Sequence, residues 1–155
     1  MNYLTELCRL TPLFEHDYPS DQCPEIMSKE GRPYNCVSFK YRSYIICIPF
    51  RTNINHKHAY LFRNTRRSRN NKSGLDFSKM IIVIDKKYLS KEKVIVDRDE
   101  YREMIVNMPV IVKKAIKYLD AYTDAVIRGS HTKDKRFERT YHYSTLKYFH
   151  KELGL

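Results

Sequence analysis

The chain has 155 residues, of which 42% are hydrophobic and 30% charged, a composition that excludes a disordered or low-complexity chain and predicts one globular domain over residues 1–155. No stretch approaches the ~20 apolar residues of a membrane span, and the first residues lack the basic and apolar regions of a signal peptide, so we expect a cytoplasmic protein. The net charge is +11, which favours polyanionic partners.

The positive charge is concentrated in one part of the chain. Residues 1–50 carry five Lys/Arg against six Asp/Glu, residues 51–79 carry eight against one, and residues 80–155 carry sixteen against eleven. Nucleic acid is the predicted partner, because phosphate contacts by Lys and Arg release counterions. We expect no membrane partner, because the basic segment lacks the apolar face of an interfacial helix.

The first strong structural signal is a β-hairpin. Residues 16–31 are polar and contain prolines, which predicts a long loop. Residues 34–39 and 44–50 then alternate between apolar and polar, as paired strands do. Pro49 is predicted to end the second strand because it has no amide hydrogen for the ladder. One face of the hairpin should carry Val37, Phe39, Tyr44, Ile46 and Ile48.

Shorter elements follow the hairpin. We expect a polar loop over residues 51–58, a short strand over 59–62, a basic loop over 63–74, a central buried strand over 80–84 and another strand over 93–97.

The second half of the chain is predicted to be helical. From Asn107, which can cap a helix, to Gly129, which can end it, apolar residues recur with a period of 3.6. Ser144 should cap a short final helix whose buried residues are Leu146, Phe149 and Leu153. Strands followed by helices predict an α+β fold with a small antiparallel sheet or barrel.

The four cysteines give no sign of a metal site. They stand at positions 8, 23, 36 and 47, without a Cys-x-x-Cys pair or a following histidine pair at zinc-finger spacing. Cys36 and Cys47 could face each other across the hairpin, but in the cytoplasm we favour buried thiols over a disulfide.

Residues 51–58 are the densest chemical stretch, with a guanidinium, a hydroxyl, two amides, two imidazoles and an ammonium. RNA cleavage needs a base for the 2′-hydroxyl, donors that stabilise charge on the phosphate, and an acid for the leaving 5′-oxygen. Histidine and arginine suit these roles. The segment has no carboxylate pair or metal-ligand cluster, so we expect no metal or other cofactor. The alternative is a solvated polar loop.

Further residues are expected to contact RNA. Arg32 should lie where the long loop meets the first hairpin strand, within reach of Thr52, and Tyr34 could stack on a base. The alternatives are a surface arginine, a structural tyrosine and a solvated basic run. The expected RNA-binding residues are Tyr34, Asn53, Asn55, Lys57, His58, Arg63, Arg66, Arg67, Arg69 and Lys72.

The runs 44–53 and 73–79, with His56 between them and an apolar strand after them, resemble the toxins of type III toxin–antitoxin systems. The nearest group is TenpN, related to ToxN, AbiQ and CptN. The resemblance implies an SH3-like β-barrel similar to the MazF/Kid toxins, with added helices. It also implies a metal-independent endoribonuclease that leaves a 2′,3′-cyclic phosphate and a 5′-hydroxyl.

The implied partners are cellular RNA substrates and an RNA antitoxin of pseudoknot-like repeats. The toxin would process the repeats and stay bound to them in a higher-order assembly. The implied biological role is phage defence. The rival interpretations are a non-catalytic RNA-binding module and a MazF-type toxin held by a protein antitoxin.

The resemblance also implies catalytic residues. Thr52 aligns with the catalytic hydroxyl, whereas Ile54 stands where the family has a lysine. The cation would then come from Arg51, Lys57 or Arg32. The expected catalytic set is Arg51, Thr52, His56 and Arg32, with His56 as base or acid. Because Thr52 and His56 follow a strand predicted to be buried, we expect neither to be needed for folding.

Overall fold

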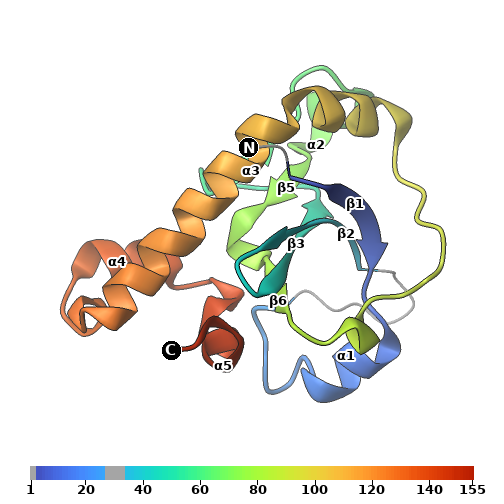
Figure 1. Cartoon of the computed structure of the whole chain (residues 1–155). Helices are drawn as coiled ribbons and strands as arrows, with labels where there is room; N and C mark the ends of the chain where they lie inside the picture. The colour runs from blue at the N-terminus through green and yellow to red at the C-terminus, as the bar shows by residue number, and fades with distance from the viewer. Residues whose placement is uncertain (1–2, 27–33) are drawn as a thin grey trace.

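The structure is a computed structural model that describes residues 3–26 and 34–155 (Figure 1). Its strands are β1 (Thr5–Arg9), β2 (Asn35–Tyr41), β3 (Tyr44–Arg51), β4 (Ala59–Leu61), β5 (Gly74–Asp76) and β6 (Ile81–Val83). Its α-helices are α1 (Pro12–Asp17), α2 (Arg66–Asn71), α3 (Arg98–Ile127), α4 (Lys135–Tyr141) and α5 (His150–Leu153). Its 3₁₀-helices are η1 (Phe77–Lys79), η2 (Lys86–Tyr88), η3 (Ser130–Thr132) and η4 (Thr145–Phe149).

The α+β class is confirmed. The strands form an open antiparallel sheet in the order β1-β2-β3-β5-β4, and β6 also pairs with β3. The hairpin is confirmed as well, because Val37 pairs with Ile48 and Phe39 with Ile46. The first strand, β1, pairs along β2 and was not predicted.

Pro49 does not end its strand, so that prediction is wrong. β3 continues to Arg51, and the interruption lies instead in its partner on one side, between β5 and β6. Residues 45–47 of β3 pair with β6, and residues 50–51 pair with β5. Between β5 and β6 the chain turns through η1, next to the one residue of β3 that has no amide hydrogen to donate. The interruption places η1 between the two paired parts of β3, with Phe77 and Ser78 buried and Lys79 half-buried.

The long helix starts earlier than predicted. α3 begins at Arg98, and the side chain of Asp97 caps it by accepting the amide hydrogen of Glu100 at 3.0 Å. The predicted strand over residues 93–97 is therefore wrong. So is the cap at Asn107, which lies inside the helix and donates to the carbonyl of Glu103.

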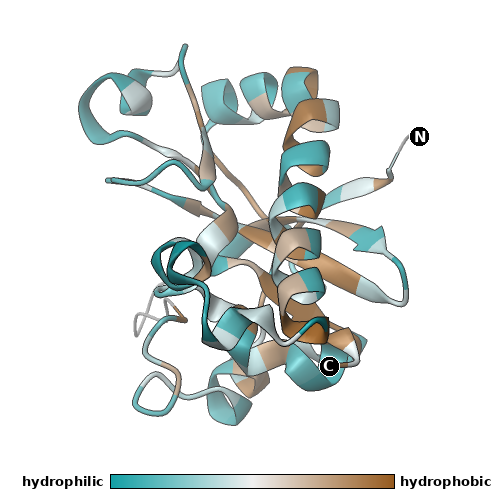
Figure 2. Ribbon diagram, turned by 90° about the vertical axis from the view of Figure 1, so that its left-hand side faces the viewer, coloured by the Kyte–Doolittle hydropathy of each residue, from teal (hydrophilic) through white to brown (hydrophobic). Residues whose placement is uncertain are grey.

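The end of the long helix was predicted correctly, since Gly129 follows it in the left-handed conformation. The buried face of α3 comprises Glu100, Met104, Met108, Ile111, Val112, Ala115, Tyr118, Leu119 and Tyr122. Figure 2 shows apolar segments in the strands and along this helix.

The basic segment is not one continuous loop. Residues 66–71 form α2, and Thr65 and Ser68 cap each other's backbone at its start. Lys72 ends the helix in the left-handed conformation, and β5 follows. Near the C-terminus, Ser144 caps the predicted short helix as expected, although the first part of that helix is the 3₁₀-helix η4.

The cysteines are buried, free thiols, as predicted. Cys36 and Cys47 do not face each other, because their partners across the hairpin are Pro49 and Ser38. Cys47 instead lies near Cys8, with 3.9 Å between the two sulfur atoms. Within residues 3–26 and 34–155, no helix has both the length and the apolar character needed to cross a membrane.

Candidate active site

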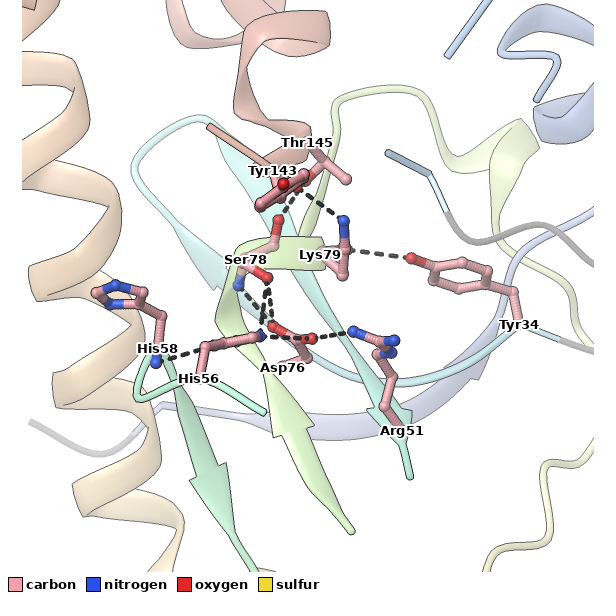
Figure 3. A network of polar contacts seen from close by, with 9 residues as sticks. All are labelled: Tyr34, Arg51, His56, His58, Asp76, Ser78, Lys79, Tyr143 and Thr145. Atoms are coloured by element: carbon pink, nitrogen blue, oxygen red, sulfur yellow. Dashed lines mark hydrogen bonds and ion pairs between the residues drawn. The ribbon is translucent and has the colours of Figure 1, made fainter. Parts of the chain in front are cut away.

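A buried carboxylate organises the polar residues around η1 (Figure 3). Asp76 ends β5 and is 0% exposed. One of its oxygens accepts from Arg51 Nη1 at 2.6 Å and faces His56 Nε2 at 3.2 Å. The other accepts from the amide of Ser78 at 2.9 Å and from its hydroxyl at 2.6 Å. A single side chain thus joins the end of β3, the 51–58 loop and η1.

His56 is held at both ring nitrogens. Its Nδ1 accepts the amide hydrogen of His58 at 3.1 Å, so the neutral ring carries its proton on Nε2. That nitrogen faces Asp76 and lies 3.3 Å from the hydroxyl of Ser78. The ring of His56 thus ties the loop to a buried charge, a contact that the expectation of no role in folding did not include.

The 51–58 loop is also fixed to the end of α2. The amide of Asn53 donates to the carbonyl of Asn71 at 2.5 Å, and the amide of Ile54 donates to that of Lys72 at 3.2 Å. Asn53 has a φ of 57°, which turns the chain sharply at this point. Ile54 is 1% exposed, so the position where the family has a lysine belongs here to the apolar interior.

The 3₁₀-helix η1 is held by three side-chain bonds. Tyr34 donates its hydroxyl to the carbonyl of Lys79 at 3.1 Å, and the ammonium of Lys79 donates to the carbonyl of Tyr143 at 2.7 Å. The hydroxyl of Thr145 donates to the carbonyl of Met80. The ring of Tyr34 is buried in the apolar core, so it is not placed to stack on a base.

The network keeps Asp76 ionised. Burial alone would raise the pKa of Asp76, but hydrogen bonds from His56, Ser78 and Arg51 outweigh it, and the pKa lies below its ordinary value. Burial lowers the pKa of Lys79, although the nearby carboxylate opposes the shift. The site therefore contains one buried carboxylate that stays ionised, and this single negative charge balances only part of the positive charge around it.

His58 is the less constrained of the two histidines. Its ring stacks on that of His56, with 5.9 Å between centroids, and lies 5.6 Å from the ring of Tyr118. Within the described part of the chain, the ring nitrogens of His58 have no hydrogen-bond partner, and the buried hydroxyl of Tyr118 has none either. Burial, His56 and Lys57 lower the pKa of His58, so the neutral ring is favoured near neutral pH.

The predicted RNA-binding arginines differ in their surroundings. Arg67 donates to Glu100 at 2.9 Å, and this carboxylate is only 2% exposed. Arg66 and Arg69 are exposed on α2 and form no ion pair with a described residue. Thr52 is half-buried at the end of β3. Asn53, Asn55, Lys57, Arg63 and Lys72 are exposed. Arg32 lies outside the described residues.

Sequence reasoning assigned no role to Asp76, Ser78 or Lys79, although they fall in the run that carries the family resemblance. One signal was available, since Asp76 is the only acidic residue between positions 51 and 79. Among residues 3–26 and 34–155, no group of three or more His, Cys, Asp or Glu side chains could hold a metal ion.

No protein-family model, curated protein or solved structure matches this chain. What the site does therefore has to be inferred from its own geometry and charge.

Proposed function

We propose that the protein is an endoribonuclease, the toxin of a type III toxin–antitoxin system. The observation that carries the proposal is the network around Asp76. It gathers Arg51, from the end of β3, and His56, from the 51–58 loop, onto one buried carboxylate, beside cations that have no ion pair within the described residues. Arrangements of this kind position phosphate-binding groups on a rigid sheet.

The proposed cleavage is the one that the resemblance implies, and the side chains present can serve it. The 2′-oxygen loses its proton and attacks phosphorus, the bond to the 5′-oxygen breaks, and that oxygen takes up a proton. The products are a 2′,3′-cyclic phosphate and a 5′-hydroxyl. Arg51 has one nitrogen on Asp76 and is 23% exposed, so its other N–H groups can reach a phosphate, and Thr52 at the strand end would orient it.

The proton-transfer group is one of the two histidines. His56 has to release Asp76 or the amide of His58 before it can exchange a proton with RNA. His58 has its ring nitrogens free of described partners, and its lowered pKa favours the neutral form that a base requires. Asp76 would hold the ring of His56 in place through its contact with Nε2.

The implied SH3-like barrel is part of the proposal. Beyond β6 the chain returns toward β1, because Leu89 forms a bridge with Leu10 and the amide of Ser90 donates to the carbonyl of Arg9. These contacts bring the end of the path β1-β2-β3-β6 back to its beginning, which supports a barrel-like arrangement. The charge of +11 supports a structured RNA as antitoxin.

The test is incubation of the purified protein with cellular RNA, followed by mapping of new 5′-hydroxyl ends. We expect cleavage at a defined sequence, and we expect it to persist in excess EDTA. Arg51→Ala and Thr52→Ala should lower the rate about 100-fold or more. Exposed His16, remote in sequence and outside the network, gives the control His16→Ala, which should cleave normally.

The histidine variants distinguish the two acid–base assignments. If His58 transfers the proton, His58→Ala should remove the acidic limb of the pH–rate profile, whereas His56→Ala should lower the rate and the melting temperature together. Binding of RNA without new ends would refute catalysis. It would favour the non-catalytic RNA-binding module, which the fully occupied ring of His56 also fits.

A further inference from the structure

A cavity of about 380 Å³ lies between β4, α2 and α3. Its size is that of a small-ligand site. The polar residues that line it are Arg63, Ser68, Lys72 and Lys114, and Tyr60 and Phe62 of the β4 segment contribute aromatic surface. Lys114 comes from the middle of α3 and had no expected role.

The charge of this cavity is unbalanced. Arg63, Lys72 and Lys114 form no ion pair with any residue of the described ranges, and no acidic residue lines the cavity. The other cations of the basic segment differ, since Arg51 and Arg67 are each paired with a buried carboxylate. The cavity is therefore a stronger site for an anion than the paired arginine on α2.

One carboxylate lies close by, since Glu103 lines the adjoining pocket together with Arg63 and Lys114 but not this cavity. Glu103 accepts hydrogen bonds from the amides of Arg63 and Asn64 and from the hydroxyl of Tyr60, at 2.8 to 3.1 Å. These bonds fix the entry of the chain into α2 and hold the ring of Tyr60. Burial and Glu103 raise the pKa of Tyr60 to about 12, so the phenol stays neutral.

We propose that this cavity binds a nucleotide of single-stranded RNA, with Lys114, Arg63 and Lys72 on the phosphate and the aromatic side of β4 against the base or ribose. The combination of a cationic rim with aromatic surface is what single-stranded nucleic acid requires, and a phosphate alone would not need the aromatic wall. This inference rests on the proposed function, because it assumes an RNA ligand.

The cavity is placed to hold RNA that reaches the Asp76 network. Ala59 of β4 pairs with Asp76, and Arg63 lies four residues farther along, about 13 Å in an extended chain. Gly74 keeps the two strands together, since a Cβ there would clash with the carbonyl of Tyr60. An RNA strand bound in the cavity would thus be anchored a short distance from the scissile phosphate.

The neighbouring lysines of α3 provide a matched test. Lys113 and Lys114 are both exposed and carry the same charge, but Lys113 lines a separate groove beside Tyr3 and not this cavity. We would measure binding of a short single-stranded RNA to Lys114→Ala and Lys113→Ala over a range of salt. Lys114→Ala should weaken binding several-fold and lower the log–log salt slope by about 0.7, and Lys113→Ala should do neither.

The aromatic part is tested with Tyr60→Ala against Tyr60→Phe. Loss of a stacked ring should weaken binding about 5-fold or more, and phenylalanine should restore it. Equal behaviour of Lys113→Ala and Lys114→Ala in a protein that binds RNA would overturn the cavity proposal alone. An effect of Lys114→Ala without one of Tyr60→Ala would overturn the nucleoside contact. Absence of RNA binding by the unaltered protein would instead refute the proposed function.

Discussion

The most direct test of the site is the substitution Asp76→Ala. The change removes a fully buried carboxylate that accepts four close contacts, from Arg51, His56 and the two donors of Ser78. Arg51 is left as a largely buried cation without its partner, and the hydroxyl of Ser78 is left without an acceptor.

The expected loss of stability can be worked out from these contacts. Removal of one partner of a buried ion pair costs about 3–5 kcal/mol, and an orphaned buried polar group costs about 1–3 kcal/mol. Arg51 keeps 23% of its side chain in solvent, which relieves part of the first cost. We therefore expect the free energy of unfolding to fall by about 3–5 kcal/mol in all, or about 6–20 °C in melting temperature for a domain of this size.

Asp85 offers a closely matched control. It also caps a three-residue 3₁₀-helix, η2, and accepts the amide hydrogen of Lys87 at 2.9 Å, the distance seen between Asp76 and Ser78. Its side chain is exposed, and among the described residues its one ion pair is with Lys87 at 3.7 Å. Asp85→Ala should cost about 0.5–1 kcal/mol by loss of the cap. Urea unfolding of both variants measures the difference, and equal losses would refute the idea that the buried network stabilises the fold.

The pH dependence of the free energy of unfolding tests the same substitution in a second, independent way. The pKa of Asp76 in the folded protein lies below its ordinary value of 3.8. Its carboxylate therefore adds stability above that value, and the contribution is lost as the pH falls through the lower folded-state pKa. The stability gap between the unaltered protein and Asp76→Ala should be constant from pH 5 to 8 and should narrow below about pH 4.

Substitutions at two further positions test how the site and the cavity are built. Gly74→Ala should push β4 away from β5, because the new Cβ meets the backbone of Tyr60 and Leu61. Thermal melting should show a loss of stability of about 1–3 kcal/mol, and RNA titration should show weaker binding. Burial raises the pKa of Glu100 despite Arg67, so its carboxylate costs stability above its ordinary pKa. Glu100→Gln should therefore change the unfolding free energy by less than about 1 kcal/mol, and Glu100→Ala should lose more; equal losses in denaturant unfolding would contradict this.

The sequence predicted the elements whose pattern is local. The alternation of residues 34–50 identified the hairpin and its buried face, and the 3.6 period identified most of the buried face of α3. The start of α3 was missed because its first turns are mainly polar and exposed, with Met104 the one buried apolar residue before Met108. A period cannot be recognised from a single apolar residue, although Asp97 followed by Glu100 is an N-terminal capping pattern.

The candidate site was only half predictable, for a physical reason. The sequence singled out Arg51 and His56 by their chemistry, but Asp76 gains its importance only through pairing of β5 with the end of β3. That pairing depends on an interruption opposite Pro49, and a break in a ladder between distant segments leaves no periodic signal in either one. A proline inside an apolar strand indicates a break in the ladder only once the partner strand is known.

The same interruption explains why the polar network can exist in the middle of a sheet. A continuous ladder would turn alternate side chains of residues 76–80 to opposite faces of the sheet, so Asp76 and Ser78 would share a face but lie a full strand repeat apart. The turn through η1 instead lets Asp76 cap its own chain and keeps Lys79 half-exposed. Arg51 lies two residues beyond Pro49, in the part of β3 that pairs with β5, and its guanidinium meets the carboxylate directly. The feature that disrupts the sheet is thus the one that assembles the site.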